Sequence, residues 1–315
     1  MSAMSLYLTD GEHPEVSDRP AIEARVKGMT GPFWLSMTGP SEEDLAWLGK
    51  HWGFHPLTLE DCRTYNPRPK LEEYTGYLFL VLHEASLGTE EMRARDIQVY
   101  FSNDYLITVQ RDESRVLGNI SQRRDELSRG TDFLLYRIFN HLTEDYFDLI
   151  GRIDERIESV EEEVIWRPGR QMLHLIFVLR QDLTALLRIA GPLREILHQI
   201  ADRDYPFVKP EHQLYFRDIY NSLIFVHEMV ETQRDLTSGA LEAYLSSISN
   251  NLNEVMKRLT LIATVFMPLT FVVGLWGMNF QLLPFDSSVV MWGTMVVIIL
   301  LPLAMLGWFR AKGWV

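Results

Sequence analysis

Small polar and soft apolar side chains recur along one line of the chain near its C-terminus. Steps of three and four residues place them on a single seam of an α-helix, as in a coiled coil. The seam consists of Asn253, Met256, Thr260, Ala263, Met267, Thr270 and Gly274. Its amide and hydroxyl groups could line a water-filled pore, narrowed by Met256, Met267 and the adjacent Leu259, since apolar constrictions gate by dewetting. Alternatively, the small residues let membrane helices pack closely, with no hole between them.

The seam runs into the first of two long apolar segments, residues 259–276 and 289–309. An apolar stretch of about 18 residues or more is a candidate transmembrane helix. We therefore predict two spans joined by a loop at 277–288. Lys257 and Arg258 precede the first span and Arg310 and Lys312 follow the second, whereas the loop has no Lys or Arg. Because positive residues stay inside, we expect a two-span protein of the cell (inner) membrane with both termini cytoplasmic, ending in a tail at 310–315.

Charge and cysteine content narrow the function further. The chain has 315 residues and a net charge of −13, of which the part from residue 259 onward contributes +1. This acidity argues against nucleic-acid binding, which needs clustered Lys and Arg. It suits cations as partners, but also an ordinary acidic cytosolic domain. Cys62 is the single cysteine, so we expect no intrachain disulfide and no cysteine-based zinc site. Residues 1–20 are polar and acidic, and we expect no signal peptide there.

Residues 1–130 are predicted to form a cytoplasmic α/β domain with a mixed sheet flanked by helices. Runs rich in aromatic and β-branched residues predict strands at 33–37, 77–83, 97–101 and 105–110. Ser41 and Asp44 resemble a capping box that opens a helix to about Trp52. His55-Pro56 begins a second short helix, and Asn103-Asp104 marks a turn between the last two strands.

From Thr131 onward the pattern predicts long helices. Residues 131–205 should form a helical hairpin, with one helix at 131–166, a second at 172–189, and a break at Gly191-Pro192 before a further helix to about Ala201. One helix should then run from about Glu211 to Trp276, with 206–258 as a stalk before the first span. At 1.5 Å per residue it is about 100 Å long, a length that suggests an oligomer.

Gly277-Met278-Asn279 stands directly after the first predicted span. In that place the triplet resembles the signature of the CorA family of divalent-cation (Mg²⁺/Co²⁺/Ni²⁺) channels, part of a superfamily that includes ZntB. Further segments are similar to family motifs, and they are 55–61 with 68–70, 244–257 and 266–271. The resemblance covers nearly the whole chain.

The resemblance implies a homopentameric funnel, in which five first spans line the pore and five second spans surround them in the bilayer. Gly277, Met278 and Asn279 would then form the selectivity filter, with Asn279 supplying a ring of amide oxygens at the outer mouth. The chemistry is reasonable, because Mg²⁺ gives up its waters reluctantly and neutral carbonyl oxygens can accept hydrogen bonds from those waters. Asn279 also suits a helix C-cap, a role compatible with the first.

The family further implies that cytosolic divalent ions bridge acids of neighbouring subunits and hold the channel shut. The candidates here are Glu60, Asp61 and Asp218, so Mg²⁺ would be both cargo and regulator. A bound cation would remove the repulsion between carboxylates. Alternatively, Asp218 is an ordinary exposed acid, paired with Arg217 or Arg234 of a neighbour.

Two departures from the family pattern bear on ion preference. The outer loop after the triplet has one acid, Asp286, and the tail is less basic than is common in the family. The ZntB branch handles Zn²⁺, whereas Met278 favours Mg²⁺, Co²⁺ and Ni²⁺. The alternatives are thus a Zn²⁺ transporter and, from another class, a membrane-anchored sensor or scaffold without a pore. We expect no enzyme, since His-Glu-x-x-His, Gly-x-Ser-x-Gly and Walker-type patterns are missing from the sequence.

Overall fold

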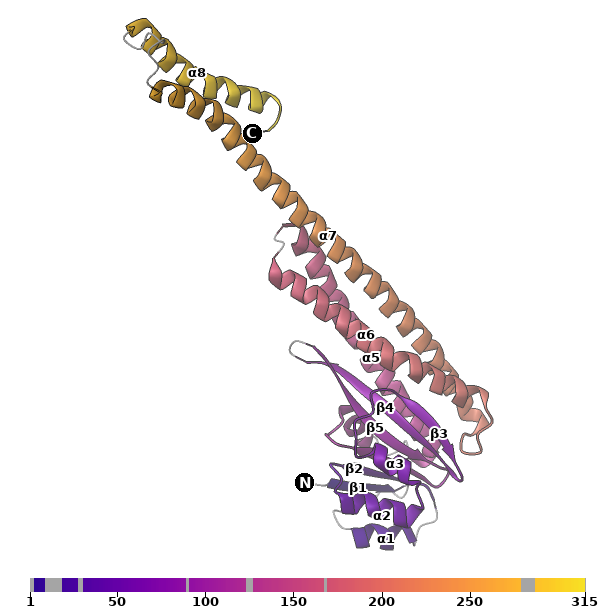
Figure 1. The fold of residues 1–315 in the computed structure, drawn as a ribbon. Coiled ribbons are helices and arrows are strands. Elements are labelled where there is room, and N and C mark those ends of the chain that lie inside the picture. The colour runs from indigo at the N-terminus through magenta and orange to yellow at the C-terminus, as the bar shows by residue number, and fades with distance from the viewer. Residues whose placement is uncertain are drawn as a thin grey trace. The chain divides into compact units, whose positions relative to one another are not determined.

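The computed structural model describes residues 3–8, 19–27, 31–88, 91–122, 127–166, 169–278 and 287–314. The chain divides into two compact units, Met1–Leu241 and Glu242–Val315. The elements of the first unit (Figure 1) are β1 (Ala3–Leu8), α1 (Arg19–Lys27), β2 (Phe33–Thr38), α2 (Glu42–Trp52), α3 (Pro56–Asp61), β3 (Lys70–Tyr74), β4 (Tyr77–Leu87), β5 (Met92–Phe101), β6 (Tyr105–Gln110), α4 (Arg115–Ser121), the 3-10 turn η1 (Leu127–Arg129), α5 (Thr131–Trp166) and α6 (Arg170–Asp202). Helix α7 (Pro210–Gly277) begins in the first unit and continues into the second, which also contains α8 (Ser288–Ala311). The finer domain boundaries at 130, 205 and 258 stay predictions.

The six strands form one mixed sheet in the order β1-β2-β6-β5-β4-β3. Strand β2 lies parallel to β6, and the other neighbours are antiparallel. The four predicted strands are confirmed within β2, β4, β5 and β6. The Asn103-Asp104 turn is also confirmed, and the Ser102 N–H closes it by donating to the Tyr105 carbonyl at 2.9 Å. Strands β1 and β3, at the two edges, were not predicted.

Helices cover both faces of the sheet. On one face α1, α2 and α3 close over a buried apolar cluster, to which the strands contribute Leu6, Leu35, Phe79 and Val109. On the other face α5 packs against β4. Alternation along β4 turns the buried Leu78, Leu80 and Leu82 toward this second face. The Tyr146 hydroxyl of α5 adds a hydrogen bond to the His83 carbonyl at 2.6 Å.

The predicted helix starts at Ser41 and His55 are confirmed. The Ser41 hydroxyl accepts from the Asp44 N–H at 3.2 Å, and Asp44 Oδ2 accepts from the Ser41 N–H at 2.8 Å. His55 caps α3 through Nδ1, which accepts from the Leu57 N–H at 3.3 Å. Pro56 occupies the first position of α3, where a helix needs no N–H donor. This local chemistry fixes where α3, with its two predicted acids, begins.

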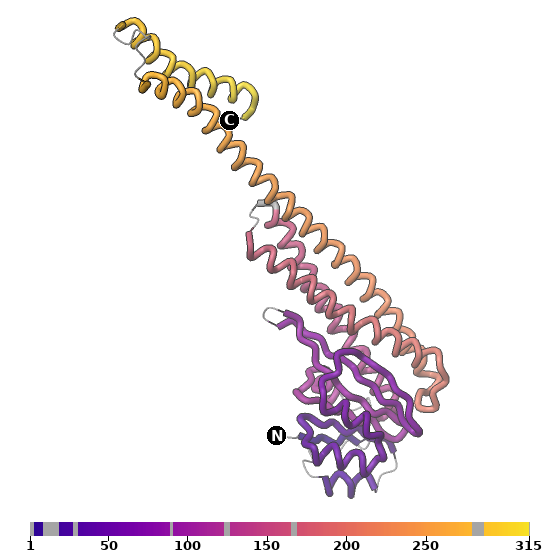
Figure 2. Tube along the Cα trace, viewed as in Figure 1, coloured from indigo at the N-terminus to yellow at the C-terminus, as the bar shows by residue number. Residues whose placement is uncertain are grey.

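Helices α5 and α6 and the first part of α7 pack along one another (Figure 2). The Phe139 ring of α5 meets the Phe216 ring of α7, and the His198 ring of α6 stacks on the Tyr220 ring of α7. Gln233 Nε2 of α7 donates to Asp154 Oδ1 of α5 at 2.6 Å. The first part of α7 therefore belongs to the core of the first unit.

The predicted break at Gly191-Pro192 is wrong, because α6 runs without interruption from Arg170 to Asp202. A proline inside a helix removes one backbone hydrogen bond and costs about 3 kcal/mol. Apolar residues are buried on both sides of it, and they are Leu186, Ile189, Ala190, Leu193 and Ile196. Burial of this stripe of α6 against the other elements of the first unit offsets the free energy of the lost hydrogen bond.

The second unit consists of the rest of α7 and α8. Both helices are long and apolar enough to cross a membrane, and their apolar windows are not buried within the chain. Helix α7 passes through the whole predicted span 259–276, including Pro268, and α8 contains the predicted span 289–309.

Candidate functional site

Every residue of the predicted seam lies on α7 with an exposed side chain, or, for Gly274, an exposed backbone. The three predicted constriction residues Met256, Leu259 and Met267 are 57%, 58% and 72% exposed. Such exposure is unusual for large apolar side chains in an aqueous protein. The seam is therefore a face of α7 that its own chain leaves uncovered.

A different stripe of α7 is partly covered. Its half-buried members within the predicted span are Leu261, Val265, Pro268, Leu269, Val272 and Trp276. Helix α8 presents a corresponding stripe, which consists of Thr294, Ile298, Leu301, Pro302, Met305 and the buried Phe309. Val273 and Trp276 of α7 and four residues of α8 line an open apolar groove of about 190 Å³. Helix α8 thus packs on this stripe of α7.

The uncovered seam and the stripe beneath α8 point in nearly opposite directions. Two steps along an α-helix turn the side-chain direction by about 200°. Ala263 and Met267 follow Leu261 and Val265 by two residues each, so the seam faces away from α8. This arrangement gives the span two distinct faces, one for its own second helix and one for something outside the chain.

The threonine hydroxyls of the seam are oriented by the backbone. Thr260 Oγ1 donates to the Met256 carbonyl at 2.8 Å, and Thr270 Oγ1 donates to the Phe266 carbonyl at 2.9 Å. A hydroxyl has one proton and two lone pairs. Because each proton is committed to the helix, each oxygen offers its lone pairs outward as an acceptor.

The predicted filter lies at the end of α7. Gly277 is the last helical residue, and the Met278 N–H donates to the Leu275 carbonyl at 3.3 Å. The Met278 side chain is 53% exposed. Asn279 and residues 280–286 lie outside the described residues.

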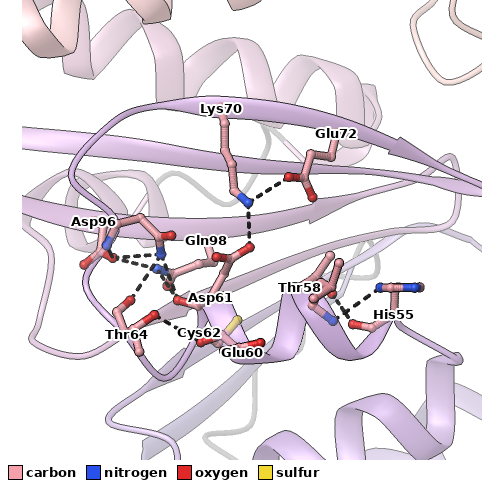
Figure 3. Close-up of polar contacts among 12 residues, drawn as sticks. His55, Thr58, Glu60, Asp61, Cys62, Thr64, Lys70, Glu72, Asp96 and Gln98 are labelled. Atoms are coloured by element: carbon pink, nitrogen blue, oxygen red, sulfur yellow. Dashed lines mark hydrogen bonds and ion pairs between the residues drawn. The ribbon is translucent and has the colours of Figure 1, made fainter.

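The predicted regulatory acids Glu60 and Asp61 lie at the end of α3 (Figure 3). Glu60 is exposed, whereas Asp61 Oδ2 accepts from Lys70 Nζ at 2.6 Å. Lys70 also donates to Glu72 Oε1 at 2.8 Å. The Asp61 carbonyl accepts from Asn66 Nδ2 at 2.8 Å. Asp61 is therefore held in place from both its backbone and its side chain.

The charges around Asp61 reinforce one another. Burial disfavours the charge on Lys70, but hydrogen bonds to Asp61 and Glu72 outweigh it and the pKa of Lys70 is raised. Burial likewise opposes the charge on Glu72, yet hydrogen bonds from Lys70 and Tyr74 prevail and the pKa of Glu72 is lowered. A metal ion at Asp61 must compete with a firmly protonated Lys70. The role of Lys70 was not predicted, although Arg68-Pro69-Lys70 follows the acids closely in the sequence.

Asp218 lies on the first part of α7 and is exposed. Its carbonyl accepts from the Ser222 hydroxyl at 3.1 Å, and Arg234 pairs with Glu231 of the same helix at 2.9 Å. In the part of the chain that the structure describes, no three His, Cys, Asp or Glu side chains are grouped so that they could hold a metal ion. A single chain thus does not bring Glu60, Asp61 and Asp218 into one such group.

Comparison with known proteins gives a consistent result across the chain. The family model described as "CorA-like Mg²⁺ transporter protein" matches residues 30–311. The cobalt/magnesium transport protein CorA of Thermotoga maritima is 36% identical over 295 residues, which cover 90% of this chain and 83% of that protein. The zinc transport protein ZntB of Yersinia enterocolitica is 21% identical over 322 residues, covering 99% of this chain and 96% of that protein.

A solved structure shows the same fold. The complete structure of the CorA magnesium transporter from Methanocaldococcus jannaschii aligns with a TM-score of 0.83 at 20% identity. The alignment covers 100% of this chain and 99% of that chain. The sheet, the long helices and the two C-terminal apolar helices therefore all have counterparts in one known architecture.

Proposed function

This chain belongs to the CorA-like Mg²⁺ transporter family, and we propose that it is a channel that admits Mg²⁺, with Co²⁺ and Ni²⁺ as further cargo. It is a membrane transport protein with two candidate C-terminal spans and not an enzyme. The observation that carries the proposal is the seam of α7, which carries outward acceptors at Thr260 and Thr270, is uncovered and is directed away from α8.

Five copies form the channel, arranged as a funnel in the cell (inner) membrane with both termini cytoplasmic. The seams of five α7 helices surround the axis, and the α8 helices lie outside them in contact with lipid. This arrangement agrees with the partly covered stripe that α7 turns toward α8. It also gives the exposed apolar residues of the second unit a partner, since lipid and neighbouring copies replace water around them.

The ion passes with its waters. Mg²⁺ needs near-ideal octahedral coordination and dehydrates reluctantly. The oxygens of Thr260 and Thr270 offer lone pairs because their protons are committed to the helix backbone. They can accept hydrogen bonds from coordinated water, as a ring of Asn279 amides does at the outer mouth. At about 100 mV a dication gains about 4.6 kcal/mol on entry, so no chemical fuel is required.

Flux measurement in proteoliposomes tests the proposal. Mg²⁺ should enter along an imposed potential, and Asn279→Ala should abolish the entry. Asn251→Ala is the matched control, since Asn251 is an exposed amide of α7 off the seam. Unchanged flux in Asn279→Ala would favour a sensor or scaffold over a channel with this filter. Zn²⁺ flux without Mg²⁺ flux would favour a ZntB-like transporter, the alternative that the Yersinia relative supports.

Cytosolic divalent ions gate the channel by bridging Glu60 and Asp61 of one subunit to Asp218 of the next. Lys70 opposes this by neutralising Asp61. Lys70→Gln should therefore lower the internal Mg²⁺ concentration that closes the channel several-fold, because the carboxylate loses its competing cation. The control is Arg63→Gln, which removes an equal charge from an exposed pair with Glu42. An unchanged Mg²⁺ dependence in Lys70→Gln would exclude Asp61 from the gating site.

A further inference from the structure

The first unit contains a polar pocket that the proposed transport function does not use. It lies between α4 and the β1-β2-β6 end of the sheet and has a volume of about 390 Å³. Small-molecule sites commonly measure about 300–1,000 Å³. The residues of its wall that matter here are Ser5, Tyr7, Trp34, Ser36, Thr38 and Gln110.

The pocket exists because the two ends of the sheet differ on this face. Toward β4 the face carries Leu78, Leu80 and Leu82, which pack beneath α5. At the β1-β2 end the same face carries serine and threonine, because alternation sends Leu35 and Met37 into the opposite core. Packing alone does not require a row of hydroxyls beside a pocket of this size.

The buried side chain of Gln110 indicates that the pocket binds a ligand. Its side chain is 4% exposed, and Nε2 donates to Thr38 Oγ1 at 2.7 Å. Its Oε1 is buried and has no hydrogen-bond partner among the described residues. Buried polar atoms of this kind are nearly always paired. If the amide is turned over, the unpaired group becomes a donor, so a partner suited to both orientations must both donate and accept, as a hydroxyl does.

The rest of the lining disfavours anionic ligands and favours a molecule that presents a flat face of C–H groups. None of the described residues that line the pocket is Lys, Arg or His, so a phosphate or carboxylate would find no counter-charge. The one carboxylate of the described lining, Glu113, is exposed and lies in solvent, so it does not favour a buried cation either. The Tyr7 and Trp34 rings stack on each other with centroids 4.5 Å apart, and because Trp34 is buried beneath it, Tyr7 presents the accessible ring of this apolar wall. A flat array of C–H groups packs against such a ring while its hydroxyls meet the polar strands.

We propose that this pocket binds a small neutral polyhydroxylated molecule, a sugar or cyclic polyol, through Gln110 and the Tyr7–Trp34 wall. The ligand donates a hydroxyl to Gln110 and exchanges further hydrogen bonds with Ser36 and Ser5. The site is independent of the ion path and does not rest on the transport proposal.

Gly118 provides the means to block the site. This glycine of α4 lines the pocket, and a Cβ placed on it meets no atom within 4 Å. Gly118→Leu therefore extends a side chain into the pocket. Gly118→Ala adds only the Cβ and, as a better helix former, serves as the matched control.

The test is ligand-observed saturation-transfer NMR on the full-length protein in lipid nanodiscs. Glycerol and sugar-headed detergents are left out, since they carry the same groups as the probes. The probes are glucose, ribose and myo-inositol, with sodium phosphate as an anionic competitor. At least one probe should give a saturable signal, unchanged in Gly118→Ala. Gly118→Leu and Gln110→Leu should weaken binding about tenfold or more, as the loss of packing space or of a buried hydrogen bond implies.

The proposal is overturned if no probe binds saturably, if binding survives Gly118→Leu, or if phosphate displaces the probe. Circular dichroism and thermal unfolding verify that each variant is folded. Should Gly118→Leu fail to fold, Gln110→Leu and Thr38→Val carry the test. Absence of Mg²⁺ flux in the parent protein, with probe binding intact, would count against the transport proposal alone.

Discussion

The two units of the chain use the same apolar residue types in opposite ways. In Met1–Leu241, Phe79, Leu82 and Ile138 are fully buried. In Glu242–Val315, Phe271 is 70% exposed and Val289 is 79% exposed. The first unit completes a core from its own residues, whereas the apolar windows of α7 and α8 in the second unit stay uncovered by the chain itself. An exposed apolar surface therefore identifies the membrane part, and the seam within it is the face of α7 that lies away from α8.

The largest expected effect compares two phenylalanines. Phe79→Ala should destabilise the protein by about 3–5 kcal/mol, because it leaves a cavity in a closed core. Phe271→Ala should change stability by no more than about 0.5 kcal/mol, since the side chain is 70% exposed and completes no core of its own chain. Thermal unfolding of both variants in lipid nanodiscs measures the difference. An equal loss in the two would mean that Phe271 is buried between subunits.

A second pair separates the two faces of α7 within the membrane. Leu261→Asp places a carboxylate beneath α8 and should cost about 2.5–3.5 kcal/mol of insertion free energy. Ala263→Asp, two residues later on the seam, should insert and assemble normally because water surrounds it. The membrane-inserted fraction of each variant is the readout. If both fail to insert, the seam is dry and the close-packing alternative is favoured.

The smallest expected effect concerns a polar group inside the first unit. Asp182 Oδ1 accepts from the Met92 N–H at 2.8 Å, while Oδ2 is buried with no partner among the described residues. Burial raises the pKa of Asp182. The fold thus favours the protonated acid, and stability is lost as pH rises from the unfolded pKa through the folded one.

Asp182→Asn keeps the acceptor and stays neutral. It should be more stable than the parent protein by about 1 kcal/mol at neutral pH, and the advantage should disappear below about pH 4. Unfolding midpoints across this pH range provide the measurement. An advantage that persists in acid would point to packing and not to ionisation.

Most of the fold could be predicted because its signals are local. The capping box at Ser41, the turn at Asn103-Asp104 and the uninterrupted apolar run through Pro268 each depend on neighbouring residues. Strand β3 was missed because Tyr74 is the one aromatic or β-branched residue in Lys70–Tyr74, and its pairing with β4 decides its structure. The false break in α6 has a similar cause, since tertiary burial around Pro192 outweighs the local preference.

The candidate site likewise has features that could be predicted from local sequence and features that could not. The period of the seam is visible in the sequence, so its position on one side of α7 could be predicted, whereas its role in lining a pore stays a prediction. The ion pair between Asp61 and Lys70 could not, because it depends on how α3 sits over the start of β3. The hydroxyl orientations of Thr260 and Thr270 follow from a helical backbone, but only the structure shows which rotamer each adopts.

The single parallel pairing in the sheet has a consequence for biosynthesis. Strands β3 to β6 form a meander in which each strand pairs with its successor, whereas β2 must wait for β6. Local pairings form faster than distant ones. The meander therefore assembles first on the ribosome, and the earliest-made strands, β1 and β2, dock last. Until Gln110 has left the exit tunnel, β2 cannot pair with β6, and the N-terminal segment carries an unpaired strand edge that is prone to aggregation.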